Sequence, residues 1–188
     1  MNVYDFDNTI YRGDSTADFY FFCLKRHKKI ALKAPSLLFG AIKFYVFKIG
    51  TKTDFKQNMY KFLQRVDFPK DLEDFWSLHK ENIKPWYLKQ QKDDDVIISA
   101  SPYFLLKPIC KELSIKHLIA SNVNKHTGVY TGINCHGKEK VRLFNINFPN
   151  KNINEFYSDS KSDTPLAEIA EKAFIVHGDD IKPWDFKI

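Results

Sequence analysis

Hydrophobic residues change their spacing near residue 85 of the chain. From there to the C-terminus, short apolar runs alternate with segments whose apolar residues recur every three or four positions. Continuous short runs are typical of strands buried on both faces of a sheet, and the longer spacing is typical of helices. We predict strands at 96–98, 117–120, 155–157 and 174–176, helices at 102–113, 139–145 and 165–172, and an antiparallel excursion at 129–134.

The N-terminal half follows a different pattern. Residues 1–10 begin with a short strand, after which no strand signal occurs until residue 84. Two groups of apolar residues in this stretch have helical spacing. They are Phe55, Met59, Phe62, Leu63 and Val66, and then Leu72, Phe75, Trp76 and Ile83 after Pro69.

Strands separated by helices imply a parallel sheet with right-handed crossovers. We therefore expect an α/β fold with a Rossmann-like parallel sheet and helices on both faces. This core would comprise residues 1–13 and 85–188, and residues 14–84 would form an all-helical insert after the first strand.

Composition narrows the class of protein. The 188 residues support one domain, or one domain with a small insert, and the net charge of +6 fits an anionic substrate or product. The lysines are spread along the chain and no nucleic-acid-binding motif is present, so nucleic acid is not expected as a partner.

Cysteine usage and the N-terminus bear on the compartment. Cys23, Cys110 and Cys135 are odd in number and widely spaced, which argues against a disulfide framework and for a reducing compartment. A zinc site at Cys135 and His136 lacks a second pair of ligands. The first strand leaves no room for a signal peptide, so we expect a cytoplasmic protein.

Residues 31–50 are the one candidate for membrane contact. The segment contains Pro35 and the charged residues Lys33, Lys43 and Lys48, which make a membrane span costly. Two short amphipathic helices are the favoured interpretation. Contact of this segment with a membrane surface is kept as an alternative.

An acidic pair follows the opening strand. Asp5 and Asp7 lie two residues apart, where the strand ends and the chain turns. One carboxylate of such a pair can bind a hard cation such as Mg²⁺ while the other acts as an acid or a base. Exposed turns often carry such pairs, so the pair alone is weak evidence.

Other polar residues fall at the ends of predicted strands, where open parallel sheets place their active sites. Ser99 follows the run at 96–98 and precedes a predicted helix, whose N-terminus favours an anion. Helix capping by Ser99 or Ser101 explains the same pattern equally well. Asp159 and Asp163 follow the strand at 155–157, although solvated loop acids are the simpler explanation.

A lysine also opens the predicted helix at 139–145. A cation near a helix N-terminus is electrostatically disfavoured, which suggests that this lysine reaches an anion outside the helix. Lys138 and Lys140 are the two candidates, and an ordinary surface lysine is the simpler explanation. His177 and Asp180, at the end of the last predicted strand, are weaker candidates for the same site.

Taken in order, these segments resemble the motifs of the haloacid dehalogenase superfamily of Mg²⁺-dependent phosphohydrolases. Residues 5–9 (DFDNT) resemble its first motif and residues 99–101 (SAS) its second. Asp159 with Asp163 corresponds to the fourth motif. Lys140 corresponds to the third, because it leaves Leu143 and Phe144 on the inward face of the helix, as the spacing of the family suggests, and Lys138 is the alternative. The position of the insert resembles the helical-cap branch, and the chain looks most similar to its phosphoserine phosphatase-like bacterial hydrolases.

The resemblance implies a role for each matching residue. Asp5 would be the nucleophile that forms an aspartyl-phosphate, and Asp7 the general acid and base. Mg²⁺ would be held by the side chains of Asp5 and Asp159 and the backbone carbonyl of Asp7. Thr9 would support the first loop and bind phosphate. Ser99, the Ala100 amide and Lys140 would bind the phosphoryl oxygens, and Asp163 would orient Lys140 or a metal-bound water.

The resemblance to phosphoserine phosphatases weakens in the cap. Asp14 stands where they carry a glutamate that contacts the substrate, and their carboxylate-binding arginine aligns with Phe62. Ser162 replaces an asparagine. We therefore expect a phosphatase for another small phosphorylated metabolite. Phosphoserine phosphatase itself, a membrane-associated phosphatase or phosphotransferase, and a non-catalytic binding protein are the alternatives, and the oligomeric state is not predicted.

Overall fold

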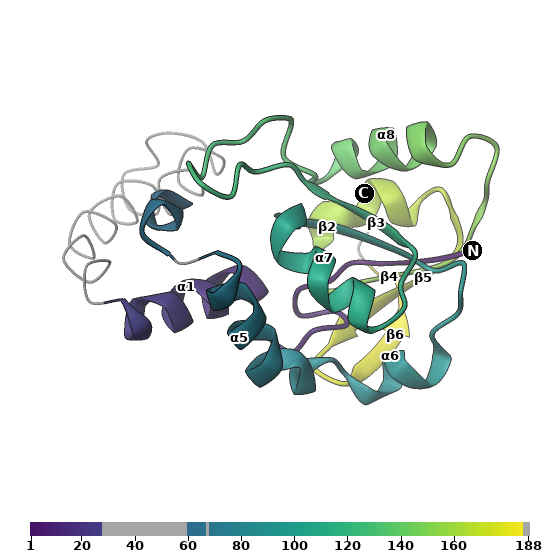
Figure 1. Ribbon diagram of the computed structural model, residues 1–188. Coiled ribbons are helices and arrows are strands. Elements are labelled where there is room, and N and C mark those ends of the chain that lie inside the picture. Colours follow the sequence, from purple (N-terminus) through teal and green to yellow (C-terminus); the bar gives the residue numbers. More distant parts are fainter. Residues whose placement is uncertain (28–59, 67, 186–188) are drawn as a thin grey trace, which may run out of the picture.

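The carboxyl ends of the parallel strands all lie toward one edge of a six-stranded sheet in the computed structural model, which describes residues 1–27, 60–66 and 68–185 (Figure 1). The order across the sheet is β3-β2-β1-β4-β5-β6; the first five strands are parallel and β6 pairs antiparallel with β5. The strands are Asn2–Tyr4 (β1), Val96–Pro102 (β2), His117–Ser121 (β3), Ile153–Ser158 (β4), Ala170–His177 (β5) and Asp180–Pro183 (β6).

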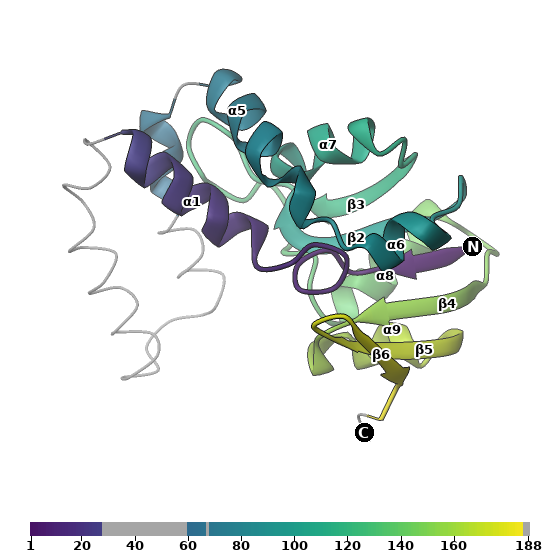
Figure 2. The same ribbon diagram turned by 90° about the horizontal axis from the view of Figure 1, so that it is seen from below.

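Helices cover both faces of this sheet (Figure 2). The α-helices are Ser15–Arg26 (α1), Lys70–His79 (α5), Pro85–Gln90 (α6), Tyr103–Glu112 (α7), Lys138–Asn147 (α8) and Thr164–Ala167 (α9). The 3-10 helices of the described residues are Lys61–Arg65 (η1), Lys80–Asn82 (η2) and Lys161–Asp163 (η3). The predicted α/β architecture with helices on both faces of a mainly parallel sheet is confirmed.

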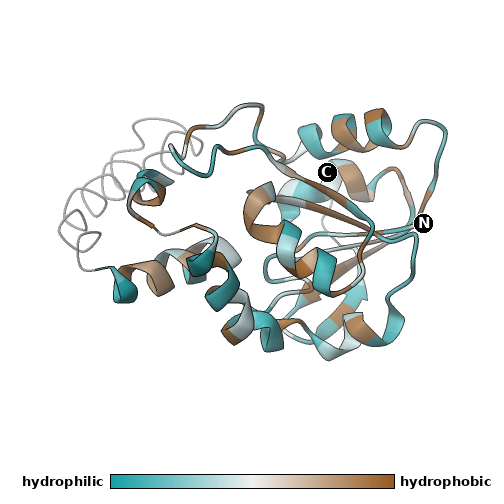
Figure 3. Ribbon diagram, in the orientation of Figure 1, coloured by the Kyte–Doolittle hydropathy of each residue, from teal (hydrophilic) through white to brown (hydrophobic). Residues whose placement is uncertain are grey.

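Alternation along the strands separates two hydrophobic cores. Tyr4, Ile97 and Tyr157 pack with residues of α1, α5, α6 and α7 on one face. Their neighbours in the chain, including Val3 and Phe156, pack with residues of α8 and α9 on the other face. Successive side chains of a strand point to opposite faces of the sheet, so a strand that is buried on both faces has a continuous run of apolar residues. Figure 3 shows hydrophobic residues concentrated along these central strands.

α1 and α5 lie beyond the edge of the sheet at which its parallel strands end, whereas α6 lies against a face of the sheet (Figure 1). α1 packs against α5 through aromatic rings, with the centroids of Phe19 and Phe75 5.2 Å apart. The buried Asp71 forms an ion pair with Arg26 and lies 2.6 Å from His27 Nε2, and so joins the end of α1 to the start of α5. Within the described residues, no helix is long and apolar enough to cross a membrane.

Several sequence expectations need correction. The helix predicted at 165–172 ends at Ala167, because Ala170 and Lys172 pair with β4 and begin β5. Ile83 does not continue a helix but forms an antiparallel bridge with Tyr11. α6 and the edge strand β6 were not predicted. The excursion at 129–134 is reduced to one bridge between Val123 and Tyr130, and Phe55, Met59 and residues 31–50 lie outside the described residues.

The loop between β3 and α8 packs closely on the insert at Gly128. This residue has φ +75°, and a Cβ added there would lie 2.4 Å from the backbone oxygen of Tyr60. We expect Gly128→Ala to lower the free energy of unfolding by about 2–3 kcal/mol, because the left-handed conformation is strained and the overlap with backbone cannot be relieved by rotating a side chain. Denaturant unfolding measures this change.

Gly178→Ala is the matched control for that substitution. Gly178 has φ +61°, but a Cβ added there would meet no atom within 4 Å. Its expected cost is about 1 kcal/mol, from backbone strain alone. Equal losses of stability in the two variants would show that the loop does not pack on Tyr60.

Candidate active site

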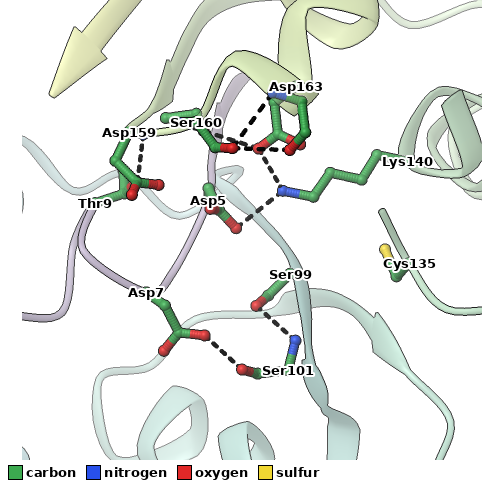
Figure 4. Close-up of polar contacts among 12 residues, drawn as sticks. Asp5, Asp7, Thr9, Ser99, Ser101, Cys135, Lys140, Asp159, Ser160 and Asp163 are labelled. Carbon is green, nitrogen blue, oxygen red and sulfur yellow. Dashed lines mark hydrogen bonds and ion pairs between the residues drawn. The ribbon is translucent and has the colours of Figure 1, made fainter. Parts of the chain in front are cut away.

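Neighbouring strands bring the two acidic motifs together. Val3 and Tyr4 of β1 pair with Phe156 and Tyr157 of β4, and the backbone N–H of Asp5 donates to the carbonyl of Tyr157 at 2.9 Å. Because the strands are parallel, the residues that follow them emerge at the same edge of the sheet. Figure 4 shows Asp5, Thr9, Asp159 and Asp163 gathered there.

Lys140 joins these motifs through its ammonium group. The side chain is 2% exposed, and Nζ donates to Asp5 Oδ1 at 2.9 Å and to Asp163 Oδ2 at 2.6 Å (Figure 4). Burial opposes the charged ammonium, but the two carboxylates outweigh it and raise the pKa of Lys140. Lys138, the alternative from the sequence, is exposed on the same helix, so Lys140 is the lysine at this site.

Asp5 is buried at the end of β1, and Asp7 is half-buried. Burial raises the pKa of Asp5, although Lys140 opposes the rise. Burial, together with the charge of Asp14, also raises the pKa of Asp7. Low-dielectric surroundings disfavour an isolated carboxylate, so these groups favour a proton or a cation beside them.

Asp7 is held from two sides. Its Oδ1 accepts a hydrogen bond from the backbone N–H of Ser15 at 2.8 Å, and its Oδ2 accepts one from the hydroxyl of Ser101. The Ser101 hydroxyl also lies 2.9 Å from that of Thr16. Asp7 is therefore oriented by the first turn of α1 and by the end of β2, on the side of the site away from Asp163 (Figure 4).

The fourth motif is fixed by short polar contacts. The backbone N–H of Asp159 donates to Thr9 Oγ1 at 3.0 Å, so Thr9 links the first loop to the fourth motif. Ser158 Oγ donates to Asp163 Oδ2 at 2.8 Å. Asp163 Oδ1 is buried without a hydrogen-bond partner among the described residues. Burial raises the pKa of Asp159.

The other predicted residues are placed as follows. Ser99 is buried, and its Oγ accepts a hydrogen bond from the backbone N–H of Ser101 at 3.1 Å. Ala100 lies between them at the end of β2. Asp14 caps α1 by accepting a hydrogen bond from the backbone N–H of Ala17. This structural contact was not predicted from the sequence, which suggested only a contact of Asp14 with the substrate.

A cavity of about 160 Å³ adjoins the fourth motif. Its lining includes Asp159, Lys84, Arg12 and His177. His177 thus lies beside the site, whereas Asp180 is exposed at the start of β6. Among the described residues, no group of three or more His, Cys, Asp or Glu side chains is arranged to hold a metal ion.

Sequence reasoning missed the contacts of three residues of this site. Ser101 was included in the second motif and considered as a helix cap, but its contact with Asp7 was not anticipated, because the strand was expected to end at residue 98 and instead continues to Pro102. Thr16 and Lys84 carried no sequence signal, since their roles depend on contacts between distant segments.

Comparisons with known proteins identify the family of the chain. Residues 3–168 match the family model of haloacid dehalogenase-like hydrolases. No curated protein matches the sequence significantly.

Solved structures share the fold at low sequence identity. A protein of unknown function from Bordetella pertussis Tohama I has a TM-score of 0.72 at 19% identity, with 92% of this chain and 87% of that chain covered. A phosphoserine phosphohydrolase-like protein from Francisella tularensis has a TM-score of 0.59 at 15% identity, covering 92% and 86%. A phospho-aspartyl intermediate analogue of phosphoserine phosphatase has a TM-score of 0.53 at 17% identity, covering 91% and 83%. With the family model matching most of its length, the chain belongs to the haloacid dehalogenase-like hydrolases.

Proposed function

We propose that this hydrolase is a Mg²⁺-dependent phosphatase that cleaves a small phosphomonoester through an aspartyl-phosphate on Asp5. The observation that carries the proposal is the convergence of Asp5, Lys140 and Asp163, which come from three separate segments and form one buried ion-paired group. The similar solved structure of a phospho-aspartyl intermediate analogue of phosphoserine phosphatase supports the same chemistry.

The two aspartates of the first motif would divide the reaction between them. Asp5 attacks phosphorus, the bond from phosphorus to the leaving oxygen breaks, and the protonated Asp7 gives its proton to that oxygen. Asp7 then takes a proton from water, which attacks phosphorus and releases inorganic phosphate from Asp5. The contacts of Asp7 with Ser15 and Ser101 support this role, because they fix the direction of the carboxyl group.

Phosphate oxygens would be bound by Ser99, the Ala100 amide and Lys140. The ammonium of Lys140 already bridges Asp5 and Asp163, so Asp163 acts by holding that ammonium in place. Thr9 would act mainly by supporting Asp159, with which its hydroxyl is in contact. A direct contact of Thr9 with phosphate stays a prediction.

The residues present fit a magnesium ion. Carboxylate and carbonyl oxygens are the ligands that Mg²⁺ prefers, and Asp5, Asp159 and the backbone carbonyl of Asp7 would supply them. Burial raises the pKa of both Asp5 and Asp159, so a bound cation would stabilise their charged forms. When bound, the ion would shield the approach of one anion to another and stabilise charge in the transition state.

The substrate is proposed only as a class. In this proposal, residues 1–13 and 85–188 form the core and residues 14–84 form the cap. The leaving group of the substrate is enclosed between the core and the cap. Asp14 is exposed at the start of α1, where it could contact that group. Phosphoserine remains disfavoured, because no arginine for its carboxylate has been identified in the cap.

Hydrolysis of a generic aryl phosphate by the purified chain tests the proposal. We expect release of inorganic phosphate with Mg²⁺ present, loss of that activity with a chelator, and recovery when excess Mg²⁺ is added back. A broad panel of phosphorylated metabolites would then identify the leaving group. If no ester in the panel is hydrolysed while the folded protein is saturated with Mg²⁺, the proposal is wrong.

A further inference from the structure

Lys84 is a buried lysine that the proposed chemistry does not use. The residue is 2% exposed, and no carboxylate of a described residue forms an ion pair with it. Burying an ammonium group is costly unless its protons find partners. The contacts of Lys84 must therefore explain how its buried ammonium group is stabilised.

The partners of Lys84 are two backbone carbonyl groups. Nζ donates to the carbonyl of Asn8 at 2.6 Å and to that of Gly178. Asn8 and Gly178 have φ values of 55° and 61°, so both lie in the left-handed region. Asn8 directly follows Asp7, and Gly178 lies in the turn between β5 and β6. One side chain thus connects two tight turns that border the site.

The backbone around Lys84 holds the same loop. The N–H of Lys84 donates to the carbonyl of Ile10, and the N–H of Arg12 donates to the carbonyl of Asn82, each at 2.8 Å. The chain that returns from the helical insert therefore runs beside the chain that enters it. Lys84 attaches this pair of segments to the loop carrying Asp7 and Thr9.

We propose that Lys84 is a positioning residue, whose ammonium fixes the loop after Asp7 and the turn at Gly178 around the reaction site. The cavity beside Asp159 fits this role, because Asn8, Gly178 and Lys84 all form part of its wall. Without the ammonium, two carbonyl groups would lose a charged donor, and the loop would be free to shift. The effect on catalysis rests on the proposed phosphatase function, whereas the effect on the loop does not.

Replacement of the side chain and addition of a free amine would test this role. We expect Lys84→Ala to lower kcat about 10- to 100-fold while KM changes by less than about threefold, because a small displacement of catalytic groups affects the reaction more than binding. Propylammonium has the atoms that Lys84→Ala removes and should restore part of kcat through the adjoining cavity. Propanol, which lacks the charge, and tetramethylammonium, which lacks the donor, should not.

Lys89→Ala is the matched control, because Lys89 is exposed on α6. An unchanged kcat in Lys84→Ala, or a loss that propanol restores as well as propylammonium does, would overturn the proposal. If Lys84→Ala does not fold, Lys84→Met fills the space without donating and is compared with the wild type in its place.

A second readout does not depend on activity. In the wild type, the Nζ protons of Lys84 should exchange slowly with water and show hydrogen-bond couplings to the carbonyl carbons of Asn8 and Gly178 by nuclear magnetic resonance. Hydrogen exchange at residues 8–10 should accelerate in the variant and slow again with propylammonium. If the wild type hydrolyses no ester, only the phosphatase proposal is wrong. Fast exchange of the Nζ protons without these couplings would show that the positioning role of Lys84 is wrong.

Discussion

Asp5→Asn is expected to lower kcat for an aryl phosphate by at least about a thousandfold, because the amide cannot act as the nucleophile of the first step. The substitution changes little else in the site. The amide side chain would have nearly the same shape as the carboxylate that it replaces, and Lys140 would keep its ion pair with Asp163. A colorimetric assay of phosphate release in the presence of Mg²⁺ measures the loss.

The control for Asp5→Asn is Asp94→Asn. Asp94 is exposed and precedes β2, far along the sheet from the carboxyl ends of the strands. We expect this variant to retain the wild-type kcat. Denaturant unfolding should show that both variants fold. Full activity in a folded Asp5→Asn protein would contradict a covalent intermediate on Asp5.

The strands that are buried on both faces of the sheet were predictable, because no polar residue interrupts their apolar runs. Strands such as β2 and β5 contain apolar runs that no helix periodicity explains. Boundaries were less predictable, because they depend on pairing with other strands. Nothing local ends α9 at Ala167; the chain leaves the helix because Ala170 pairs with Ile153 of β4. β6 is exposed along its length, so its sequence lacks the hydrophobic signal of a strand.

The acidic residues of the site were predictable from position at strand ends, because parallel strands deliver such residues to one edge. The choice of Lys140 also required knowing which face of the helix points inward, since Lys138 is only two residues away. The contacts that orient these groups were not predictable. Ser101 meets Thr16 across 85 residues of sequence, and Lys84 meets Asn8 across 76. Such pairs follow from the packing of the insert on the core rather than from any local pattern.

Lys140→Met should both remove activity and destabilise the fold. The side chain is buried, and its loss would leave Asp5 and Asp163 without their shared cation. Removing one partner of a buried ion pair costs about 3–5 kcal/mol, so we expect a loss of that size in the free energy of unfolding at pH 7. Because the folded-state pKa of Lys140 is raised, the stability that its protonation contributes is fully present below the ordinary lysine pKa and is lost only as the pH rises through the folded-state value.

Lys138→Met on the same helix is the matched control for Lys140→Met. Lys138 is exposed at the first position of α8, so its replacement should change stability by less than about 0.5 kcal/mol and leave kcat near the wild-type value. Measuring both variants by denaturant unfolding and by phosphate release separates the two lysines of the third motif. If Lys138→Met were the variant that loses activity while Lys140→Met kept it, the phosphoryl group would be bound on the other side of the helix, and the ion pairs of Lys140 would be purely structural.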